Sequence, residues 1–162
     1  MFQVVLHEPC IPPNTGNIIR LCANAGAALH LVEPLGFSLD DRQLRRAGLD
    51  YHEYASLQVH RNLDECLAAL APTPVFAFST RGRTSILDTA FPCPSVLLFG
   101  SETQGLPAPL LETLRPAQVI ALPMQPRGRS LNLSNAVAIA LFEAWRQHGF
   151  AGARALRAGS TF

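Results

Sequence analysis

Residues 127–132, Arg-Gly-Arg-Ser-Leu-Asn, place arginine, serine and asparagine side chains directly before a long apolar stretch that predicts a helix over 132–148. Asn132 or Ser134 can cap this helix, because either side-chain oxygen accepts an unpaired backbone N–H of the first turn. Gly149 is a typical C-terminal stop. Ser130, Asn132 and Arg129 could hold a ligand at the start of this helix.

Two further polar loops follow strand-like runs. Residues 100–107 read Gly-Ser-Glu-Thr-Gln-Gly-Leu-Pro after the apolar run 95–99, and residues 79–84 read Ser-Thr-Arg-Gly-Arg-Thr after 75–79. In open parallel sheets, ligands bind beyond the carboxyl ends of the strands. We therefore expect these loops and the loop 123–130 to line one site.

The spacing of Gly100 and Gly105 matches two glycines of a phosphate-binding loop, but Leu and Pro follow where that motif needs Lys and Ser or Thr. No G-x-G-x-x-G occurs in the chain. A common mononucleotide or nicotinamide site is therefore disfavoured. Glu102 suits a neutral or cationic ligand better than a phosphate. An ordinary turn with a glycine at each end explains the spacing equally well.

Strand-like and helix-like segments alternate along the chain, which predicts a parallel sheet with helices on both faces. Pro12 and Pro13 read as a stop before a helix over 14–25, with Asn14 or Thr15 as its cap and Gly26 at its end. Expected strands are 2–7, 28–32, 75–79, 95–99 and 118–122, and the other expected helices are 39–47, 62–70, 107–114 and 132–148.

Composition places the chain among globular proteins that do not cross a membrane. Its 162 residues are expected to form one domain over 1–150 with a loosely attached tail over 151–162. No apolar run reaches the roughly 18 residues of a membrane span, and no signal peptide is recognisable, so we expect a cytoplasmic protein. The formal net charge of +1 gives no indication of a nucleic-acid partner. The four cysteines are interpreted as buried free thiols, and no metal-ligand spacing is present.

Three ordered motifs together resemble the SPOUT class of methyltransferases, and within it the minimal branch that methylates the ribose of cytidine or uridine 34 in tRNA. They are residues 14–26, beginning Asn-Thr-Gly-Asn-Ile-Ile-Arg, residues 98–107, Leu-Phe-Gly-Ser-Glu-Thr-Gln-Gly-Leu-Pro, and residues 122–146 with Ser-Leu-Asn-Leu-Ser-Asn-Ala-Val at 130–137. The resemblance covers the chain from Phe2 to about Gly149. It implies a sheet tied into a deep C-terminal trefoil knot.

The resemblance also implies S-adenosylmethionine as cofactor and a transfer of its methyl group to a ribose 2′-hydroxyl. The family's cofactor positions match Phe78, Gly100 and Leu122, with a further contact from Ser130. The family assigns catalysis to the arginine that matches Arg20. A guanidinium almost always keeps its proton, so charge stabilisation suits Arg20 better than a role as general base.

The remaining site residues follow from the same resemblance. Asn14 is expected to place the ribose or Arg20, and Glu102 to give electrostatic support near the sulfonium. Ser130 and Asn132 are expected to position the nucleotide and the loop. Candidate phosphate contacts are the clustered arginines Arg81, Arg83, Arg127, Arg129 and Arg146.

A helix that is apolar on almost every side must be buried on more than one face. For the helix 132–148, we expect the sheet on one side and a second subunit on the other, as in SPOUT homodimers. Phe142 and Trp145 are the candidate interface anchors, although ordinary core aromatics remain an alternative.

The expected substrate is the anticodon loop of tRNA, with C34 or a modified U34 of leucine tRNAs as the methylated nucleotide. Alternatives are a SPOUT methyltransferase for another tRNA position or for rRNA, and a cofactor-binding RNA chaperone or regulator without turnover. A nucleotide-dependent enzyme is the third alternative, disfavoured by the missing phosphate-loop lysine.

Overall fold

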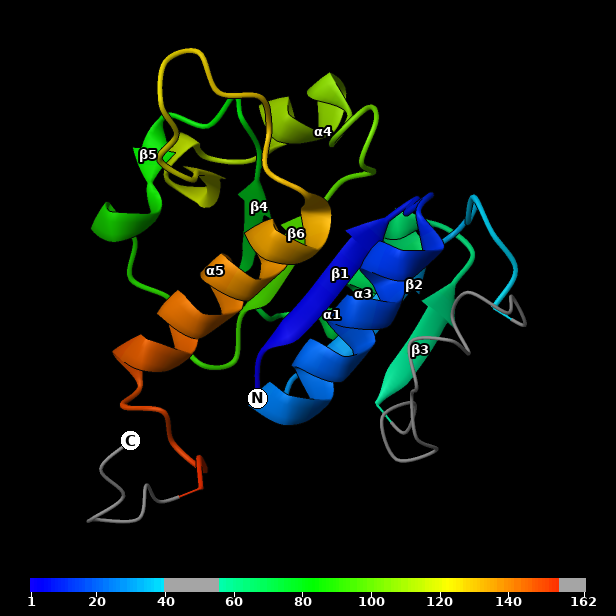
Figure 1. Cartoon of the computed structure of the whole chain (residues 1–162), viewed down its shortest axis with the longest axis horizontal. Helices are drawn as coiled ribbons and strands as arrows, with labels where there is room; N and C mark the ends of the chain where they lie inside the picture. The colour runs from blue at the N-terminus through cyan, green and yellow to red at the C-terminus, as the bar shows by residue number, and fades with distance from the viewer. Residues whose placement is uncertain (40–55, 155–162) are drawn as a thin grey trace.

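Short, buried apolar strands form the centre of the protein. The structure is a computed structural model, and it describes residues 1–39 and 56–154. Seven strands lie in the order β3-β2-β1-β6-β4-β7-β5, and every neighbouring pair is parallel (Figure 1). The strands are β1 (Gln3–His7), β2 (Ala28–Val32), β3 (Leu57–His60), β4 (Val75–Phe78), β5 (Thr84–Ser85), β6 (Val96–Phe99) and β7 (Val119–Ala121).

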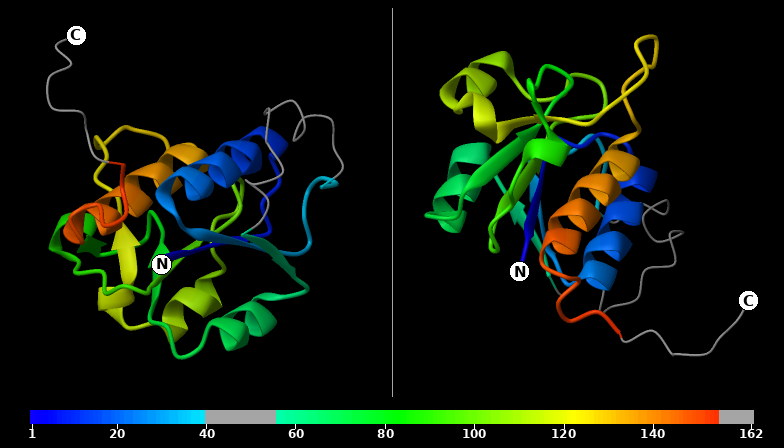
Figure 2. Two further views of the ribbon diagram at one scale, coloured as in Figure 1. Left: turned by 90° about the horizontal axis from the view of Figure 1, so that it is seen from below. Right: turned by 90° about the vertical axis from the view of Figure 1, so that its left-hand side faces the viewer.

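Helices cover both faces of this sheet, as the strand pattern predicts. Figure 2 shows α1 (Pro12–Ala25) and α5 (Leu133–Gln147) side by side on one face, with α3 (Leu63–Leu70) and α4 (Ala108–Thr113) on the other. Two 3₁₀ turns, η2 (Ile86–Asp88) and η3 (Pro116–Gln118), lie in the connections. Each face has its own apolar cluster, so both sides of the central strands are dry.

The five expected strands are confirmed to within a residue or two at their ends, and three expected helices are found at α3, α4 and α5. Two strands were missed. The strand β3 is a four-residue edge strand with two exposed positions, and β5 has only two residues. Such segments bury too little to give a continuous apolar pattern. The expected helix 39–47 lies almost wholly outside the described residues.

The first helix begins earlier than expected. Pro12 and Pro13 occupy its first turn instead of stopping the chain before it, and Ile11 is the N-cap. Proline suits this position, because its fixed φ is helical and its missing N–H has no partner in the first turn anyway. The expected caps Asn14 and Thr15 are buried inside the helix.

The last helix is capped as expected, since the Asn132 side chain accepts a hydrogen bond from the Ser134 backbone N–H. Gly149 follows with φ +63°, the left-handed conformation of a helix stop. One face of α5 packs into the core, where Leu141 and Ala144 are fully buried. Its other face leaves Phe142 44% exposed in the single chain.

The thiols differ in part from expectation, and the start of the tail contacts α5. The beginning of the tail returns to α5, where the Trp145 indole N–H donates to the Ala151 carbonyl oxygen. All four cysteines are free as expected, and Cys22 and Cys66 are buried, but Cys93 is exposed because it lies in a surface connection, and Cys10 is only partly buried. Within residues 1–39 and 56–154, no helix is long and apolar enough to cross a membrane.

Candidate functional site

A hollow of about 460 Å³ opens where β4, β6 and β7 end, at the edge of the sheet that the loops predict. Sites for small ligands commonly have such volumes and combine apolar walls with a few polar groups. The three expected loops all line it, together with the starts of α1 and α5. The predicted site residues among its lining are Asn14, Phe78, Arg81, Gly100, Glu102, Leu122, Ser130 and Asn132.

Gly100 and Gly105 close the loop at the end of β6. The Gly105 N–H donates to the Ser101 carbonyl oxygen at 2.9 Å, and the two residues form an isolated antiparallel bridge. A Cβ added to Gly100 would lie 2.0 Å from the Gly105 carbonyl carbon, so no side chain fits there. Gly105 has φ +67°, a conformation that disfavours other residues. The glycine spacing therefore builds a compact loop that is not a phosphate loop.

Glu102 ties this loop to the start of α1. One carboxylate oxygen accepts the Cys10 backbone N–H at 2.8 Å, and the other accepts the Ile11 backbone N–H at 3.2 Å and the Asn14 amide at 2.9 Å. The Cys10 thiol also donates to the carboxylate, at 3.1 Å. A negative charge is favourable at this end of a helix because of its dipole. Glu102 thus holds the two residues before α1 and the Asn14 side chain in its first turn.

Asn14 extends this connection to the third loop. Its side-chain oxygen accepts the Asn132 amide N–H at 2.9 Å, while its own amide donates to Glu102. Asn132 in turn accepts both the backbone N–H and the hydroxyl of Ser134. Residues from the three sequence motifs are therefore joined in one hydrogen-bonded chain at the mouth of the hollow.

The pKa of Glu102 lies below its ordinary value of 4.5. Burial acts to raise it, but the hydrogen bonds from the Cys10 backbone, the Asn14 amide and the Cys10 thiol outweigh burial. A carboxylate with a lowered folded-state pKa stabilises the protein above the ordinary carboxyl pKa, and this contribution is lost as the pH falls through the folded-state value.

We expect Glu102→Gln to lower the free energy of unfolding at pH 7 by about 1–3 kcal/mol, because a glutamine N–H group would face donors only. Asn14 cannot relieve this by turning its amide, since its oxygen already accepts from Asn132. Urea unfolding measures the effect. The difference in the free energy of unfolding between this variant and the parent protein should shrink below pH 4.5. Replacing the exposed Glu112 by glutamine should cause neither the loss at pH 7 nor its dependence on pH. An equal loss at pH 7 and pH 3 would contradict the role of the charge.

Apolar side chains form the inner wall of the hollow. The rings of Phe78 and Phe99 stack with centroids 4.7 Å apart, and Leu106, Leu122 and Leu133 complete the wall. The exposed polar residues Thr80, Thr103, Gln104 and Ser130 border it. A flat, uncharged ring system joined to a polar, charged chain would find an apolar wall and hydrogen-bonding groups here.

Arg20 lies outside the hollow. It follows Asn14 by six residues, which turns its side chain by about 240° around the helix and moves it about 9 Å along the axis. Asn14 is accordingly buried at the site, whereas Arg20 is exposed. Nothing here identifies Arg20 as a group acting on a ligand in the hollow of its own chain.

The other expected arginines lie at varying distances from the hollow. Arg81 lines it, while Arg83, Arg127 and Arg129 are exposed on the adjoining loops. Arg146 lies in the last turn of α5, about 15 Å along the helix from Ala136. Its guanidinium forms two hydrogen bonds to Glu143, at 2.7 and 2.9 Å. A contact of these arginines with RNA stays a prediction.

Sequence reasoning missed several members of the site, among them Ile11 and Phe99. Ile11 lines the hollow from the segment before α1, and Phe99 lines it from the end of β6. Phe99 could have been found, because it ends a buried strand in the same way as Phe78. The Asn14–Asn132 hydrogen bond could not, since 118 residues separate its partners.

Comparison with known proteins gives a consistent result. A model of the SpoU rRNA Methylase family matches residues 1–142. A tRNA (cytidine(34)-2′-O)-methyltransferase of Burkholderia cenocepacia (strain HI2424) is 62% identical over 154 residues, which are 94% of this chain and 99% of that protein.

Solved structures show the same likeness. One that concerns the 2-OH methylation of C/U34 on tRNA has a TM-score of 0.86 and 43% identity, over 92% of this chain and 97% of that one. An AdoMet-bound rRNA methyltransferase from Sinorhizobium meliloti has a TM-score of 0.78 and 28% identity, over 90% of this chain and 56% of its own.

Proposed function

The chain belongs to the SpoU rRNA methylase family, and from this membership we propose that it is a tRNA methyltransferase that modifies the ribose 2′-hydroxyl of nucleotide 34. The observation that carries the proposal is the 62% identity, over nearly the whole of both chains, to a tRNA (cytidine(34)-2′-O)-methyltransferase. The family also contains rRNA methyltransferases, which makes ribosomal RNA the main alternative substrate.

S-adenosylmethionine fits the hollow at the ends of β4, β6 and β7. When bound, it supplies a methyl group made electrophilic by a sulfonium. We assign Phe78 and Leu122 to the adenine as apolar surface, and the Gly100 backbone and Ser130 to its polar groups, because all four residues line the hollow. Glu102 contributes negative charge to this end of the sheet, although both its oxygens are held by the start of α1.

At the substrate, the chain's task is to make a ribose hydroxyl react at neutral pH. We assign Arg20 to stabilising negative charge on the attacking 2′-oxygen, because preorganised positive charge lowers the barrier where negative charge develops. Asn14 and Asn132 fix the start of α1 against the loop before α5 and so hold the helix that carries Arg20. We assign Arg81, Arg83, Arg127 and Arg129 to the phosphates of the anticodon loop.

Because Arg20 is exposed and outside the hollow of its own chain, we propose that a homodimer brings Arg20 of one subunit to the hollow of the other. The exposed face of α5 is the proposed contact. Ile139 (45% exposed), Phe142 (44%) and Phe150 (39%) form an apolar strip there. We further propose that the segment 122–132 closes a trefoil knot, as in SPOUT proteins, and that the enzyme works in the cytoplasm.

We expect Phe142→Asp to yield monomers, because a charge on this strip cannot be desolvated in an apolar contact. Sedimentation equilibrium measures the result. Val59→Asp is the matched control, since Val59 is also 44% exposed but lies on the edge strand β3. Dimers of unchanged stability in the Phe142 variant would contradict the proposed interface.

The substrate proposal is tested by mass spectrometry of anticodon nucleosides in tRNA from cells with and without the gene. We expect 2′-O-methylation of C34 and of modified U34 in leucine tRNAs to disappear without it. Adding the purified protein and S-adenosylmethionine to this tRNA should restore it. If nucleotide 34 were unchanged and a ribose methyl were lost from ribosomal RNA or from another tRNA position, that RNA position would be the substrate and the proposal would be wrong.

A further inference from the structure

A row of polar side chains crosses the otherwise apolar face of the sheet beneath α3. In the parallel register, His30 of β2 is paired with Val5, and His60 of β3 is paired with Val32. Paired residues share a face, so both histidines lie on the face of Val5 and Val32, where the apolar cluster with Cys66 of α3 is found. Buried polar groups in such surroundings are costly unless they have partners.

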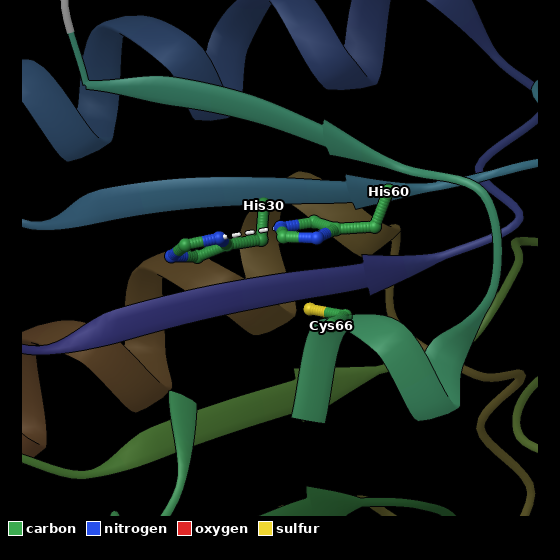
Figure 3. A group of neighbouring side chains, drawn as sticks. All are labelled: His30, His60 and Cys66. Atoms are coloured by element: carbon green, nitrogen blue, oxygen red, sulfur yellow. Dashed lines mark hydrogen bonds between the residues drawn. The ribbon is translucent and has the colours of Figure 1, made fainter. Parts of the chain in front are cut away.

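The three side chains, from β2, β3 and α3, converge on one point, and none of them lines the hollow at the ends of β4, β6 and β7. Figure 3 shows His30 and His60 aligned along their hydrogen bond, with the Cys66 sulfur near them. His30 Nδ1 and His60 Nε2 are 3.0 Å apart, and one nitrogen of each ring lies within 4.8 Å of the other and of the Cys66 sulfur. His30, His60 and Cys66 are 2%, 7% and 0% exposed.

Gln3 fixes which nitrogen of His30 can act as a ligand. Its side-chain oxygen lies 2.9 Å from His30 Nε2, and an amide oxygen only accepts, so Nε2 carries the proton. His30 Nδ1 therefore points its lone pair at the cluster and accepts from His60 Nε2. A metal-ligating histidine typically has its other ring N–H held by such an acceptor.

The neutral ring of His30 suits a metal ligand, whereas the Cys66 thiol has to lose its proton to bind a cation. Burial and then the neighbouring His60 lower the pKa of His30 to about 4, so its ring is neutral at physiological pH. Burial and then the charge of Glu65 raise the pKa of the Cys66 thiol to about 11, so the thiol keeps its proton until a cation displaces it. Free thiols that lack such neighbours behave as small apolar side chains.

We propose that His30, His60 and Cys66 form a metal site that binds one Zn²⁺ ion, separate from the methyl-transfer site. Zinc takes imidazole nitrogens at about 2.0–2.1 Å and thiolate sulfur at about 2.3 Å in a tetrahedron. Two such nitrogens are about 3.3 Å apart, so the two rings need to separate by a few tenths of an ångström and turn until both lone pairs point at the ion. The described residues that converge here supply three protein ligands.

Binding changes the proton positions in a defined way. The thiol proton leaves to solvent as the sulfur–zinc bond forms, and the His60 proton moves from Nε2 to Nδ1, where it no longer faces His30. The ion then joins β2, β3 and α3, and so attaches the edge strand β3 to the sheet through side chains. An ion that binds only the folded protein raises its melting temperature.

Cobalt(II) titration of tag-free, metal-depleted protein tests the site. We expect one equivalent to produce the near-ultraviolet thiolate-to-cobalt charge-transfer band, and Zn²⁺ to displace the cobalt and raise the melting temperature. Cys66→Ala should abolish the band, and His60→Gln should weaken binding at least tenfold. Cys22→Ala is the matched control, because Cys22 is a free thiol only 1% exposed but lies on α1.

Each outcome decides the proposal. A band that persists in Cys66→Ala, or disappears in Cys93→Ser, would place the metal at another thiol and overturn it. The absence of cobalt binding by the parent protein would also overturn the proposal. Circular dichroism verifies that the variants fold, and His60→Gln provides a second test that keeps the thiol. Methyl transfer by Cys66→Ala should be unchanged, so failure of the metal site leaves the proposed enzymatic function untouched.

Discussion

Replacing Arg20 by alanine is expected to reduce kcat for tRNA methylation by about 10²–10³-fold, the loss typical of removing one group that stabilises developing negative charge. The affinity for S-adenosylmethionine should not change, because Arg20 does not line the hollow of its own chain and is assigned to the ribose oxygen, not to the cofactor, at the hollow of the partner. Single-turnover methylation of unmodified tRNA measures the first quantity, and calorimetric titration with S-adenosylmethionine measures the second.

Two variants make this result specific. Arg20→Lys keeps the charge but loses the planar, forked donor group, so it should recover only part of the activity. Arg115→Ala removes an exposed arginine that precedes η3 and does not line the hollow, and it should retain full activity. Methylation by Arg20→Ala at the parental rate would show that the arginine has no part in the reaction.

The subunit from which Arg20 acts can be determined by mixing two inactive variants. Leu122→Trp fills the hollow, and Arg20→Ala removes the arginine. If the site is shared between subunits, half of the randomly paired dimers are mixed and hold one intact site, so about a quarter of the parental activity should return. If Arg20 acts within its own chain, each mixed dimer has no intact site, and no activity returns.

Replacing Gly100 by alanine is expected to weaken S-adenosylmethionine binding by about 10²-fold, the cost of an ångström-scale displacement at a site. The added Cβ would lie 2.0 Å from the Gly105 carbonyl carbon and 2.3 Å from the Leu106 nitrogen. Both are backbone atoms, so the loop itself must open. The same overpacking should lower the free energy of unfolding by about 1–3 kcal/mol.

Gly26→Ala separates the loop displacement from a general loss of stability. Gly26 has φ +65° and open space at its Cβ position, so alanine there costs about 1 kcal/mol of backbone strain without displacing a neighbour. It ends α1, roughly 20 Å along the helix from the hollow. Its affinity for S-adenosylmethionine should match that of the parent. A Gly100→Ala protein with parental affinity would show that the loop is not part of the cofactor site.

Helices and strands were predictable where they depend on the pattern of neighbouring residues in the chain. Continuous apolar runs such as 95–99 indicated the buried strands, and Asn132 and Gly149 marked the start and stop of α5, because capping depends on neighbours in the chain. The start of α1 was misjudged at Pro12 and Pro13, since the same residue that breaks a helix interior also fits its first turn. The edge strand β3 was missed because half of its residues face solvent.

The candidate site shows the same division. The sequence alone determined which three loops follow the strands of a parallel sheet and which residue types they carry, because strand order along the chain and polarity are local properties. Only the tertiary structure decided that Glu102 holds the residues before α1, that Asn14 bonds to Asn132, that Gly100 is required by the backbone of Gly105, and that Arg20 does not line its own hollow. Those facts depend on side-chain direction and on contacts between residues far apart in the chain, which no local pattern encodes. The convergence of His30, His60 and Cys66 has the same origin, since strand register and helix placement bring together residues that share no motif.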